Sequence, residues 1–205
     1  MSALLIVGAG GHGKVVAETA ELLNRWDSIV FADDKFPELV NIGKWPIVSR
    51  VSFFDLEKKG FTDFVVAVGN NNTRLQIQRG LLGSGLSPVS ITHPSSIISP
   101  TVKLGGGTVV FANAVVNADT VVGDACIINT AASVDHDCVL GDGVHISPGA
   151  RLAGEVRVGN GSWLGIGASV IQCINIGQNV VVGAGAAVVS DIPDGVIAKG
   201  VPARY

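Results

Sequence analysis

The sequence has few charged residues, few aromatic residues and few cysteines. Charged residues make up 15% of its 205 residues and the formal net charge is −3, whereas globular domains usually carry about 25% charged residues. Because there is no excess of basic residues, nucleic acid is not expected as a partner. The cysteines, Cys126, Cys138 and Cys173, form neither a CxxC metal pair nor an even disulfide framework, which favours a reducing cytoplasm.

Long hydrophobic runs are also missing. No apolar run reaches the roughly 18 residues that a membrane-spanning helix needs. The apolar run at residues 3–7 is too short for the core of a signal peptide and has no basic flank, so it predicts a first strand. Since 47% of the residues are apolar, the chain can fill a core. We expect a folded cytoplasmic protein without a membrane span.

Glycine is abundant, with 27 residues, and the second half of the chain carries an aliphatic repeat. Every sixth residue over 98–188 is Val, Ile or Leu, which makes sixteen positions in a row, and the register fails at Thr92 and Asp194. A period of six is neither the helical period nor the alternation of a simple strand. The residue two places before each aliphatic position is small or β-branched, as at Ala114 and Cys126.

This pattern resembles the left-handed parallel β-helix of hexapeptide-repeat acyltransferases. In that fold three hexads form one triangular coil, so that residues 18 apart lie in one column. The resemblance implies about five coils that stack on one another as in other solenoids. The aliphatic positions then fill the interior, and Cys126 and Cys138 are small core residues.

The first half predicts a Rossmann-like α/β domain over residues 1–92, followed by the β-helix and a C-terminal tail over 93–205. Alternating strands and helices imply a parallel sheet with right-handed crossovers. The expected strands are residues 3–7, 29–31 and 64–68, and the expected helices follow Gly13, cover residues 73–82, and run from a cap at Ser52 to Gly60.

A glycine-rich loop, Gly8-x-Gly10-x-x-Gly13, links the first strand to the first helix. Such a loop exposes N–H groups at a helix N-terminus to phosphate, although it can also be a purely structural turn. A single nucleotide fits better than NAD, because only about 90 residues precede the repeat, half of a doubly wound domain. Ligands of such sheets bind at the carboxyl ends of the strands. The residues expected around this crevice are Gly10, Gly11, His12, Asp33, Asp34 and Gly69.

Short motifs along nearly the whole chain resemble one family, the bacterial UDP-4-amino-sugar N-acetyltransferases of the bacillosamine pathway, within the wider sialic-acid O-acetyltransferase-like group. The motifs are Gly10-Gly11-His12-Gly13, Phe31-Ala32-Asp33-Asp34, Gly69-Asn70-Asn71, Asn129-Thr130, Val134-Asp135-His136-Asp137-Cys138, His145, Gly165-Ile166-Gly167 and Gly200-Val201-Pro202-Ala203.

The resemblance implies an acetyl transfer from acetyl-CoA to the 4-amino group of a UDP-linked amino sugar, giving a product of the UDP-N,N'-diacetylbacillosamine type. It implies that His136 is the general base and that Asp137, where relatives can carry glutamate, raises its basicity. It also implies a homotrimer, no metal, and acetyl-CoA contacts from His145, Ile166 and Ala184. The six crevice residues become UDP-sugar contacts.

Column arithmetic agrees with these roles. Gly154 lies 18 residues after His136, so its N–H is a candidate oxyanion donor beside the base. Ile166 and Ala184 are also 18 apart and form one column along which an extended pantetheine could lie. His136 and His145 are nine apart, half a coil, on opposing sides of the prism. They can share a site only if two subunits meet, which argues for a closed cyclic oligomer.

Three alternatives remain at this point. A zinc-dependent carbonic anhydrase of the γ type needs three histidine ligands, whereas the repeat holds only His136 and His145. A non-catalytic solenoid would not need the His136-Asp137 pair or the glycine-rich loop. O-acetylation of sialic acid or a related sugar is the closest competitor, because the sequence does not fix the acceptor atom.

Overall fold

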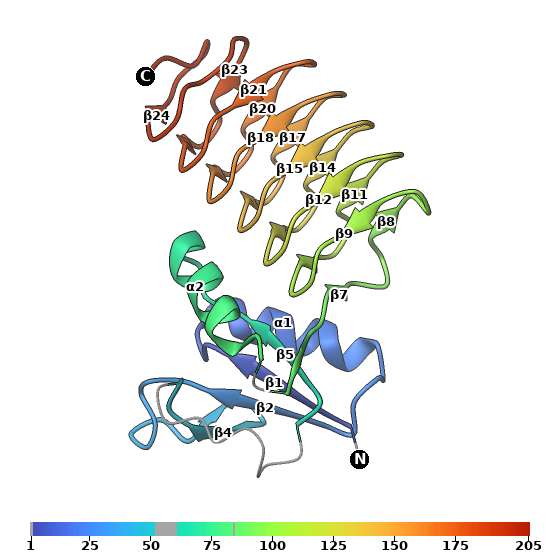
Figure 1. Ribbon diagram of the computed structural model, residues 1–205, viewed down its shortest axis with the longest axis vertical. Coiled ribbons are helices and arrows are strands. Elements are labelled where there is room, and N and C mark those ends of the chain that lie inside the picture. Colours follow the sequence, from blue (N-terminus) through green and yellow to red (C-terminus); the bar gives the residue numbers. More distant parts are fainter. Residues whose placement is uncertain (1, 52–60, 84) are drawn as a thin grey trace.

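The computed structural model describes residues 2–51, 61–83 and 85–205. An α/β domain at the N-terminal end is followed by a triangular solenoid of short strands, with the C-terminus at the far end (Figure 1). The predicted fold class, a Rossmann-like domain followed by a left-handed parallel β-helix, is confirmed.

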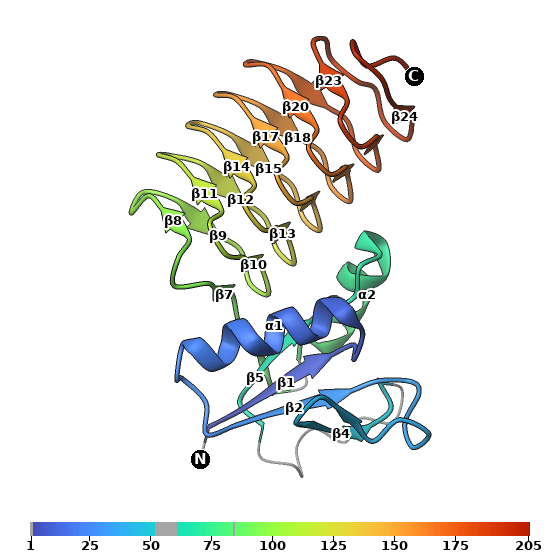
Figure 2. The same cartoon turned by 180° about the vertical axis from the view of Figure 1, so that it is seen from behind.

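The α/β domain is a six-stranded sheet in the order β3-β4-β2-β1-β5-β6, with the fully buried β1 near its centre. Helix α1 lies between the sheet and the solenoid in both views (Figures 1 and 2). The elements are β1 (Ala3–Val7), α1 (Gly11–Leu22), β2 (Ser28–Ala32), β3 (Asn41–Ile42), β4 (Trp45–Ser49), β5 (Asp63–Val66), α2 (Asn71–Leu81) and β6 (Ser87–Pro88).

The sheet departs from the expected parallel arrangement at one edge. Strands β1, β2, β4, β5 and β6 pair in parallel, but β3 runs antiparallel to β4. Gly43 supplies a positive φ of 59° in the short turn between them, which is what a tight hairpin requires. Helix α2 begins at Asn71, earlier than predicted, because Asn70 caps it by accepting a hydrogen bond from Thr73 N–H. The short helix predicted from Ser52 to Gly60 lies outside the described residues.

The solenoid has three flat faces, each a parallel sheet of two-residue strands. The seven-stranded face contains β7 (Ile91–Thr92), β10 (Val109–Val110), β13 (Ile127–Ile128), β16 (His145–Ile146), β19 (Trp163–Leu164), β22 (Val181–Val182) and β24 (Ile197–Ala198). The six-stranded face contains β8 (Ile97–Ile98), β11 (Val115–Val116), β14 (Ser133–Val134), β17 (Arg151–Leu152), β20 (Ser169–Val170) and β23 (Ala187–Val188). The five-stranded face contains β9 (Lys103–Leu104), β12 (Val121–Val122), β15 (Val139–Leu140), β18 (Arg157–Val158) and β21 (Asn175–Ile176).

The six-residue repeat predicts the interior correctly. From Val110 to Val188 each aliphatic residue of the repeat is buried, and the residues two places earlier fill the corners. Cys126 and Cys138 are free, buried core residues, as predicted. Pairing on the seven-stranded face already includes β7 at Ile91–Thr92, and the division of the chain after residue 92 stays a prediction.

Each corner of the solenoid turns at a residue with left-handed backbone, and these residues also recur every six positions. They are Gly107, Asn113, Asp119, Ala125, Ala131, Asp137, Gly143, Gly149, Glu155, Gly161, Gly167, Cys173, Asn179 and Gly185. Left-handed geometry is strained for most residues and easiest for glycine, Asn and Asp. The corner sequence therefore reflects backbone geometry as well as chemistry.

Helix α2 lies along the corner between the five-stranded and seven-stranded faces. Gln78 donates to Gly106 O at 2.8 Å, and Asn71 donates to Gly161 O at 3.0 Å. A helical turn rises about 5.4 Å and the coils stack about 4.8 Å apart, so side chains one turn apart on α2 reach neighbouring coils. The helix thereby fastens the α/β domain to the solenoid.

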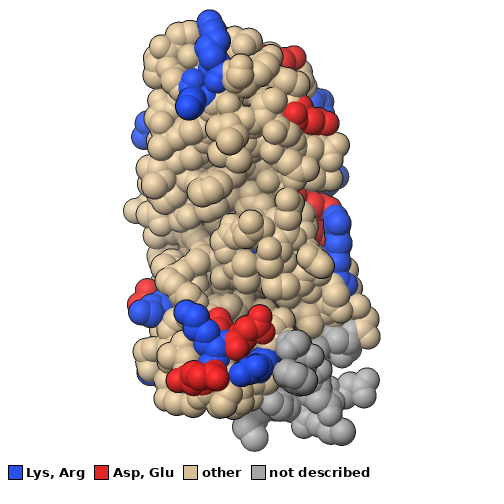
Figure 3. Space-filling model, turned by 90° about the vertical axis from the view of Figure 1, so that its left-hand side faces the viewer, with Lys and Arg blue, Asp and Glu red and all other residues tan. Residues whose placement is uncertain are grey.

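The far end of the solenoid is covered by the C-terminal tail. Strand β24 pairs with β22, and the tail turns back so that Ala203 N–H donates to Ala187 O at 2.7 Å. On the face shown in Figure 3, charged side chains gather at the two ends and along one edge, and the middle carries few. In the part of the chain that the structure describes, neither helix has the length and apolarity to cross a membrane.

Two corner glycines with the same backbone test how closely α2 is docked. Gly143 and Gly149 both have φ of +66°, but a Cβ at Gly143 would collide with Leu75 of α2, whereas one at Gly149 meets nothing within 4 Å. Gly149→Ala should lower the free energy of unfolding by about 1–2 kcal/mol through left-handed strain alone. Gly143→Ala should add about 1–3 kcal/mol of overpacking. Chemical denaturation measures both, and equal losses would contradict the docking.

Candidate active site

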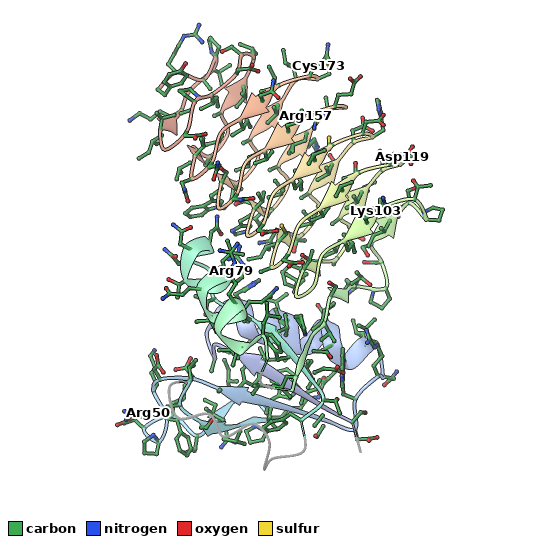
Figure 4. The ribbon with its side chains drawn as sticks, in the orientation of Figure 1. Arg50, Arg79, Lys103, Asp119, Arg157 and Cys173 are labelled. Carbon is green, nitrogen blue, oxygen red and sulfur yellow. The ribbon has the colours of Figure 1, made fainter. Side chains whose placement is uncertain are left out.

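His136 and Asp137 form a pair at the corner between the six-stranded and five-stranded faces, the corner marked by Asp119 and Cys173 in Figure 4. His136 Nδ1 lies 2.8 Å from Asp137 Oδ2, and both side chains are more than half exposed. The shorter carboxylate therefore does reach the imidazole. Asp137 is the left-handed residue of this corner, with φ of 57°, a conformation that Asp tolerates well.

Neighbouring groups fix the His136 corner and its charge. Asp135 Oδ1 accepts from His136 N–H at 2.9 Å and from the Asn117 amide at 2.8 Å. The pKa of His136 is raised, first by its hydrogen bond to Asp137 and then by the charges of Asp135, Asp137 and Glu155. Because a carboxylate only accepts, neutral His136 donates from Nδ1 and leaves Nε2 free to take a proton.

Gly154 lies in the same column, in contact with the His136 ring. A Cβ at this position would stand 2.5 Å from Cε1 and 2.6 Å from Nε2 of His136, so only glycine leaves room for the imidazole. Among the described residues no acceptor bonds to the Gly154 N–H, while its carbonyl accepts from Cys173 N–H at 3.0 Å. The predicted oxyanion donor is therefore adjacent to the predicted base and not used by the fold.

His145 lies on β16 and is held rigidly in one tautomer. Its ring stacks on Trp163 of β19, with centroids 5.8 Å apart and planes 4° from parallel. Asn129 Oδ1 accepts from Thr130 N–H, so the Asn129 amide nitrogen must donate to His145 Nε2, which is 3.1 Å away. The proton of neutral His145 is then on Nδ1. Burial, and after it the charge of Arg74 and the presence of His12, lower the pKa of His145 to about 3.

A cleft of about 450 Å³ opens beside His145, between the seven-stranded face and the N-terminal end of α2. Gly69 and the asparagines Asn70, Asn71 and Asn72 form one wall. His145 and Trp163 are on the opposite wall. Gly69 therefore faces His145 and does not line the cleft of Gly10 and Gly11, as the sequence had suggested.

Ile166 and Ala184 are both exposed at the corner between the seven-stranded and six-stranded faces. Gly185 N–H donates to Ile166 O at 2.8 Å, so the two residues are stacked neighbours as their spacing predicts. Within one chain, the six-stranded face separates this corner from the corner of His136.

The glycine-rich loop contains two kinds of glycine. Gly8 has φ of 107°, and a Cβ at Gly13 would collide with the carbonyl of Gly8, so the fold itself requires both. Gly10 and Gly11 would meet nothing within 4 Å. They line an open cleft of about 280 Å³ with Lys14 and the β3–β4 hairpin. The fold does not explain Gly10 and Gly11, which are the two glycines that a bound phosphate would contact.

The acidic pair after β2 is divided between two tasks. Asp33 Oδ2 accepts from Ala9 N–H at 2.8 Å and Asp33 Oδ1 accepts from Lys35 N–H at 2.9 Å, so both oxygens are used to hold the glycine-rich loop. Asp34 is exposed and accepts one long bond from Val51 N–H at 3.3 Å. Asp34 is thus the one that is available to a ligand.

His12 is mostly buried between the two parts of the chain. Its ring meets Phe111 edge-on at 5.5 Å, and Nε2 is buried without a hydrogen-bond partner. Burial first, and the charge of Arg74 second, lower the pKa of His12 to about 4. His12 is therefore neutral near pH 7.

The structure brings His136, Asp137 and Gly154 together, and it brings Gly69 to His145. It does not bring His136 and His145 together within one chain. The sequence analysis missed Arg74, Lys14 and Trp163. Trp163 is 18 residues after His145, so the same column arithmetic would have found it. In the residues that the structure describes, His, Cys, Asp and Glu side chains nowhere form a group of three that could hold a metal.

Two family descriptions match the chain. Residues 3–81 match "PglD N-terminal domain", and residues 119–154 match "Bacterial transferase hexapeptide (six repeats)". The UDP-N-acetylbacillosamine N-acetyltransferase of Bacillus subtilis (strain 168) is 42% identical over 115 residues, which cover 55% of this chain and 52% of the relative. The GDP-perosamine N-acetyltransferase of Escherichia coli O157:H7 is 29% identical over 125 residues, covering 56% of this chain and 53% of the relative. The chain thus spans about half the length of these curated relatives.

Solved structures match over nearly the whole chain. The acetyltransferase domain of PglB from Neisseria gonorrhoeae FA1090 is 44% identical, with a TM-score of 0.94 and 98% of both chains covered, and it is also known in complex with acetyl coenzyme A. PerB from Caulobacter crescentus, solved with CoA and GDP-perosamine, is 41% identical, with a TM-score of 0.90, 98% of this chain and 96% of that chain covered.

Proposed function

This chain belongs to the hexapeptide-repeat family of acetyl-CoA-dependent nucleotide-sugar N-acetyltransferases, and from that membership we propose that it transfers acetyl from acetyl-CoA to the 4-amino group of a nucleotide-linked amino sugar. The observation that carries the proposal is the corner where Asp137 bonds to His136 Nδ1 at 2.8 Å and Gly154 touches the ring. A base with its second nitrogen free and an unused N–H donor beside it are the two groups that acyl transfer needs.

In the proposed mechanism the neutral 4-amino nitrogen attacks the thioester carbonyl. As the new C–N bond forms, His136 Nε2 takes the proton of the amine and Asp137 stabilises the imidazolium. The Gly154 N–H donates to the negative oxygen of the tetrahedral intermediate. When the C–S bond breaks, the thiolate of CoA leaves and takes the proton from His136. Direct transfer of this kind needs no covalent enzyme intermediate.

The nucleotide sugar is proposed to bind at the α/β domain, residues 1–92, through Gly10, Gly11, His12, Asp34 and Gly69. Helix α1 offers unpaired N–H groups to phosphate, since no acidic residue stands in its first turn. Asp33 acts indirectly, because both of its oxygens hold the loop.

Acetyl-CoA is proposed to bind at the β-helix, residues 93–205. The exposed column of Ile166 and Ala184 provides an apolar track of the kind that a pantetheine chain would follow. His145, rigid and neutral, stands one side of a coil away. Three free cysteines suit a reducing compartment, for which we propose the cytoplasm.

A homotrimer is proposed because a single chain keeps His136 and His145 on different sides of the prism. The exposed aliphatic residues Ile171 and Val189 stack one coil apart, in the column directly before that of His136. They would be buried if a neighbouring copy packed there. The face in Figure 3, poor in charge over its middle, could also be covered without desolvating many ions.

The nucleotide is the part of the substrate on which the relatives differ, since one is named for a UDP sugar and another for a GDP sugar. We expect acetylation of a UDP-4-amino sugar at a higher kcat/KM than of GDP-perosamine, measured by CoA release and mass spectrometry. Asp34→Ala should raise the KM of the nucleotide sugar about 10-fold or more, as one lost hydrogen bond to a polar ligand group allows, and leave that of acetyl-CoA nearly unchanged. Tight NAD binding with no affinity for nucleotide sugars would refute the assignment.

His136→Ala should lower kcat by about 10²- to 10⁴-fold at saturating substrates, which is the usual contribution of a general base. The exposed side chain carries no core packing, so the thermal midpoint should stay unchanged. Asp137→Asn should cost less and should shift the acidic limb of the pH–rate profile to lower pH, because the hydrogen bond that most raises the pKa of His136 is weakened. Near-normal kcat in His136→Ala would leave the corner without a catalytic role.

Complementation tests whether two chains share one site. Co-expressed His136→Ala and His145→Ala chains should form mixed trimers with more activity than either variant alone, since some interfaces then contain one intact copy of each histidine. Sedimentation should show trimers for all three proteins. A stable, fully active monomer, or mixtures no more active than their parents, would contradict the shared site.

A further inference from the structure

Arg74 is a buried cation at the junction of the two domains. It lies on α2, is 1% exposed, and has every one of its five N–H donors bonded. Nε donates to Ala125 O at 2.7 Å, Nη1 to Val68 O at 2.9 Å and Gly69 O at 3.3 Å, and Nη2 to Asn71 Oδ1 and Gly143 O at 2.9 Å each. The fork is thus fully used, which a lysine could not do with three donors on one atom.

The acceptors of Arg74 belong to two separate elements. Val68 and Gly69 follow β5 in the α/β domain, and Gly69 forms one wall of the cleft of His145. Ala125 and Gly143 are corner residues of the solenoid, whose next strands are β13 and β16, and β16 carries His145. One planar group therefore sets the distance between the two walls. Asn71 continues the connection by donating to the carbonyls of Gly161 and Ser162.

The charge of Arg74 has no counter-ion at this place. Among the described residues its acceptors are four main-chain carbonyls and one amide oxygen, none of them a carboxylate. Burial lowers the pKa of Arg74 to about 10, so it still carries its charge at neutral pH. The titratable groups that it faces are His12 on α1, His145 on β16 and the buried Cys126 thiol.

We propose that Arg74 is a positioning residue for the reaction: its fork fixes the Gly69 wall against the His145 wall, and its charge keeps His145 in the neutral tautomer that accepts from Asn129. The importance of this cleft rests on the proposed function, in which Gly69 contacts the nucleotide sugar and His145 contacts acetyl-CoA. The effect on His145 itself does not, because it is a property of the unliganded protein.

Protonation of His145 would disrupt this wall. A second proton would sit on Nε2 and point at the Asn129 amide nitrogen, which is itself a donor 3.1 Å away. The Asn129 amide cannot simply turn over, because its Oδ1 accepts from Thr130 N–H. A nearby positive charge makes that protonation less favourable, so the geometry of the wall and the charge of Arg74 act in the same direction.

Three variants separate the fork, the charge and the position on α2. Arg74→Lys keeps a cation and loses the fork, whereas Arg74→Gln loses the charge and most donors. Arg79→Gln is the control, because Arg79 is on the same helix with its side chain 63% exposed and only a surface pair with Asp142 at 3.3 Å (Figure 4). Each is measured for thermal midpoint, for kcat and both KM values well below that midpoint, and by NMR titration of His145 in unliganded protein.

Arg74→Lys should lower kcat/KM by about 10- to 100-fold, as a displacement of about 1 Å between substrate-binding groups does, while His145 stays neutral to the same low pH. Arg74→Gln should lower kcat/KM similarly and raise the pKa of His145 towards its ordinary value of about 6.5 without reaching it, because burial remains. Arg79→Gln should change neither.

Unchanged kinetic constants in a folded Arg74→Lys protein would overturn the role of the fork. An unchanged His145 titration in Arg74→Gln would overturn the role of the charge. Failure of both Arg74 variants to fold, with Arg79→Gln folded, would overturn the proposal by assigning Arg74 to stability alone. If the titration shifts as expected but the protein acetylates no nucleotide sugar, the proposed function fails and the effect of Arg74 on His145 stands.

Discussion

Parallel main-chain pairing over an 18-residue period is the constraint on which the rest of this molecule depends. Val115 N–H donates to Ala132 O and Ser133 N–H donates to Ala150 O, so every coil repeats the register of the one before. Because side chains alternate between inside and outside along a strand, a one-residue slip would exchange core and surface. The same register brings Gly154 against His136 and Trp163 against His145. Both chemical groups of the solenoid are thus consequences of backbone stacking.

Helix α2 relies on that register from outside. Its polar side chains bond to carbonyls that stand in a row only because the coils are stacked. A buried arginine without a carboxylate is normally costly, since a charge out of water needs compensation. Here five dipoles provide it, and they do so without neutralising the field that reaches His12 and His145. A carboxylate in the same place would have stabilised the cation and removed its influence on both imidazoles.

The sequence predicted those parts of the structure that follow from counting. Sixteen aliphatic positions identified the solenoid, and the spacing of His136 and Gly154 identified neighbours that are indeed in contact. The β3–β4 hairpin escaped because its strands are short and the second contains Pro46, which weakens a strand pattern. Arg74 escaped for a different reason. An arginine in a helix pattern usually faces solvent, and the carbonyl row that buries it belongs to residues 51 and 69 places further along. The separate tasks of Asp33 and Asp34 likewise depend on which main-chain N–H the fold brings to each.

The footprint of α2 ends near Gly161, while the solenoid continues to the tail that covers its last strands. Inside the footprint the number of residues per coil is fixed, because an added coil would move the next carbonyl about 4.8 Å away from the side chain that bonds to it. Beyond Gly161 no helix measures the distance, and a whole additional coil of 18 residues would shift only the tail that covers the open strand edge. The first coils therefore act as a ruler for the two substrate-facing walls, and the later ones form a region whose length evolution can change without retuning the chemistry.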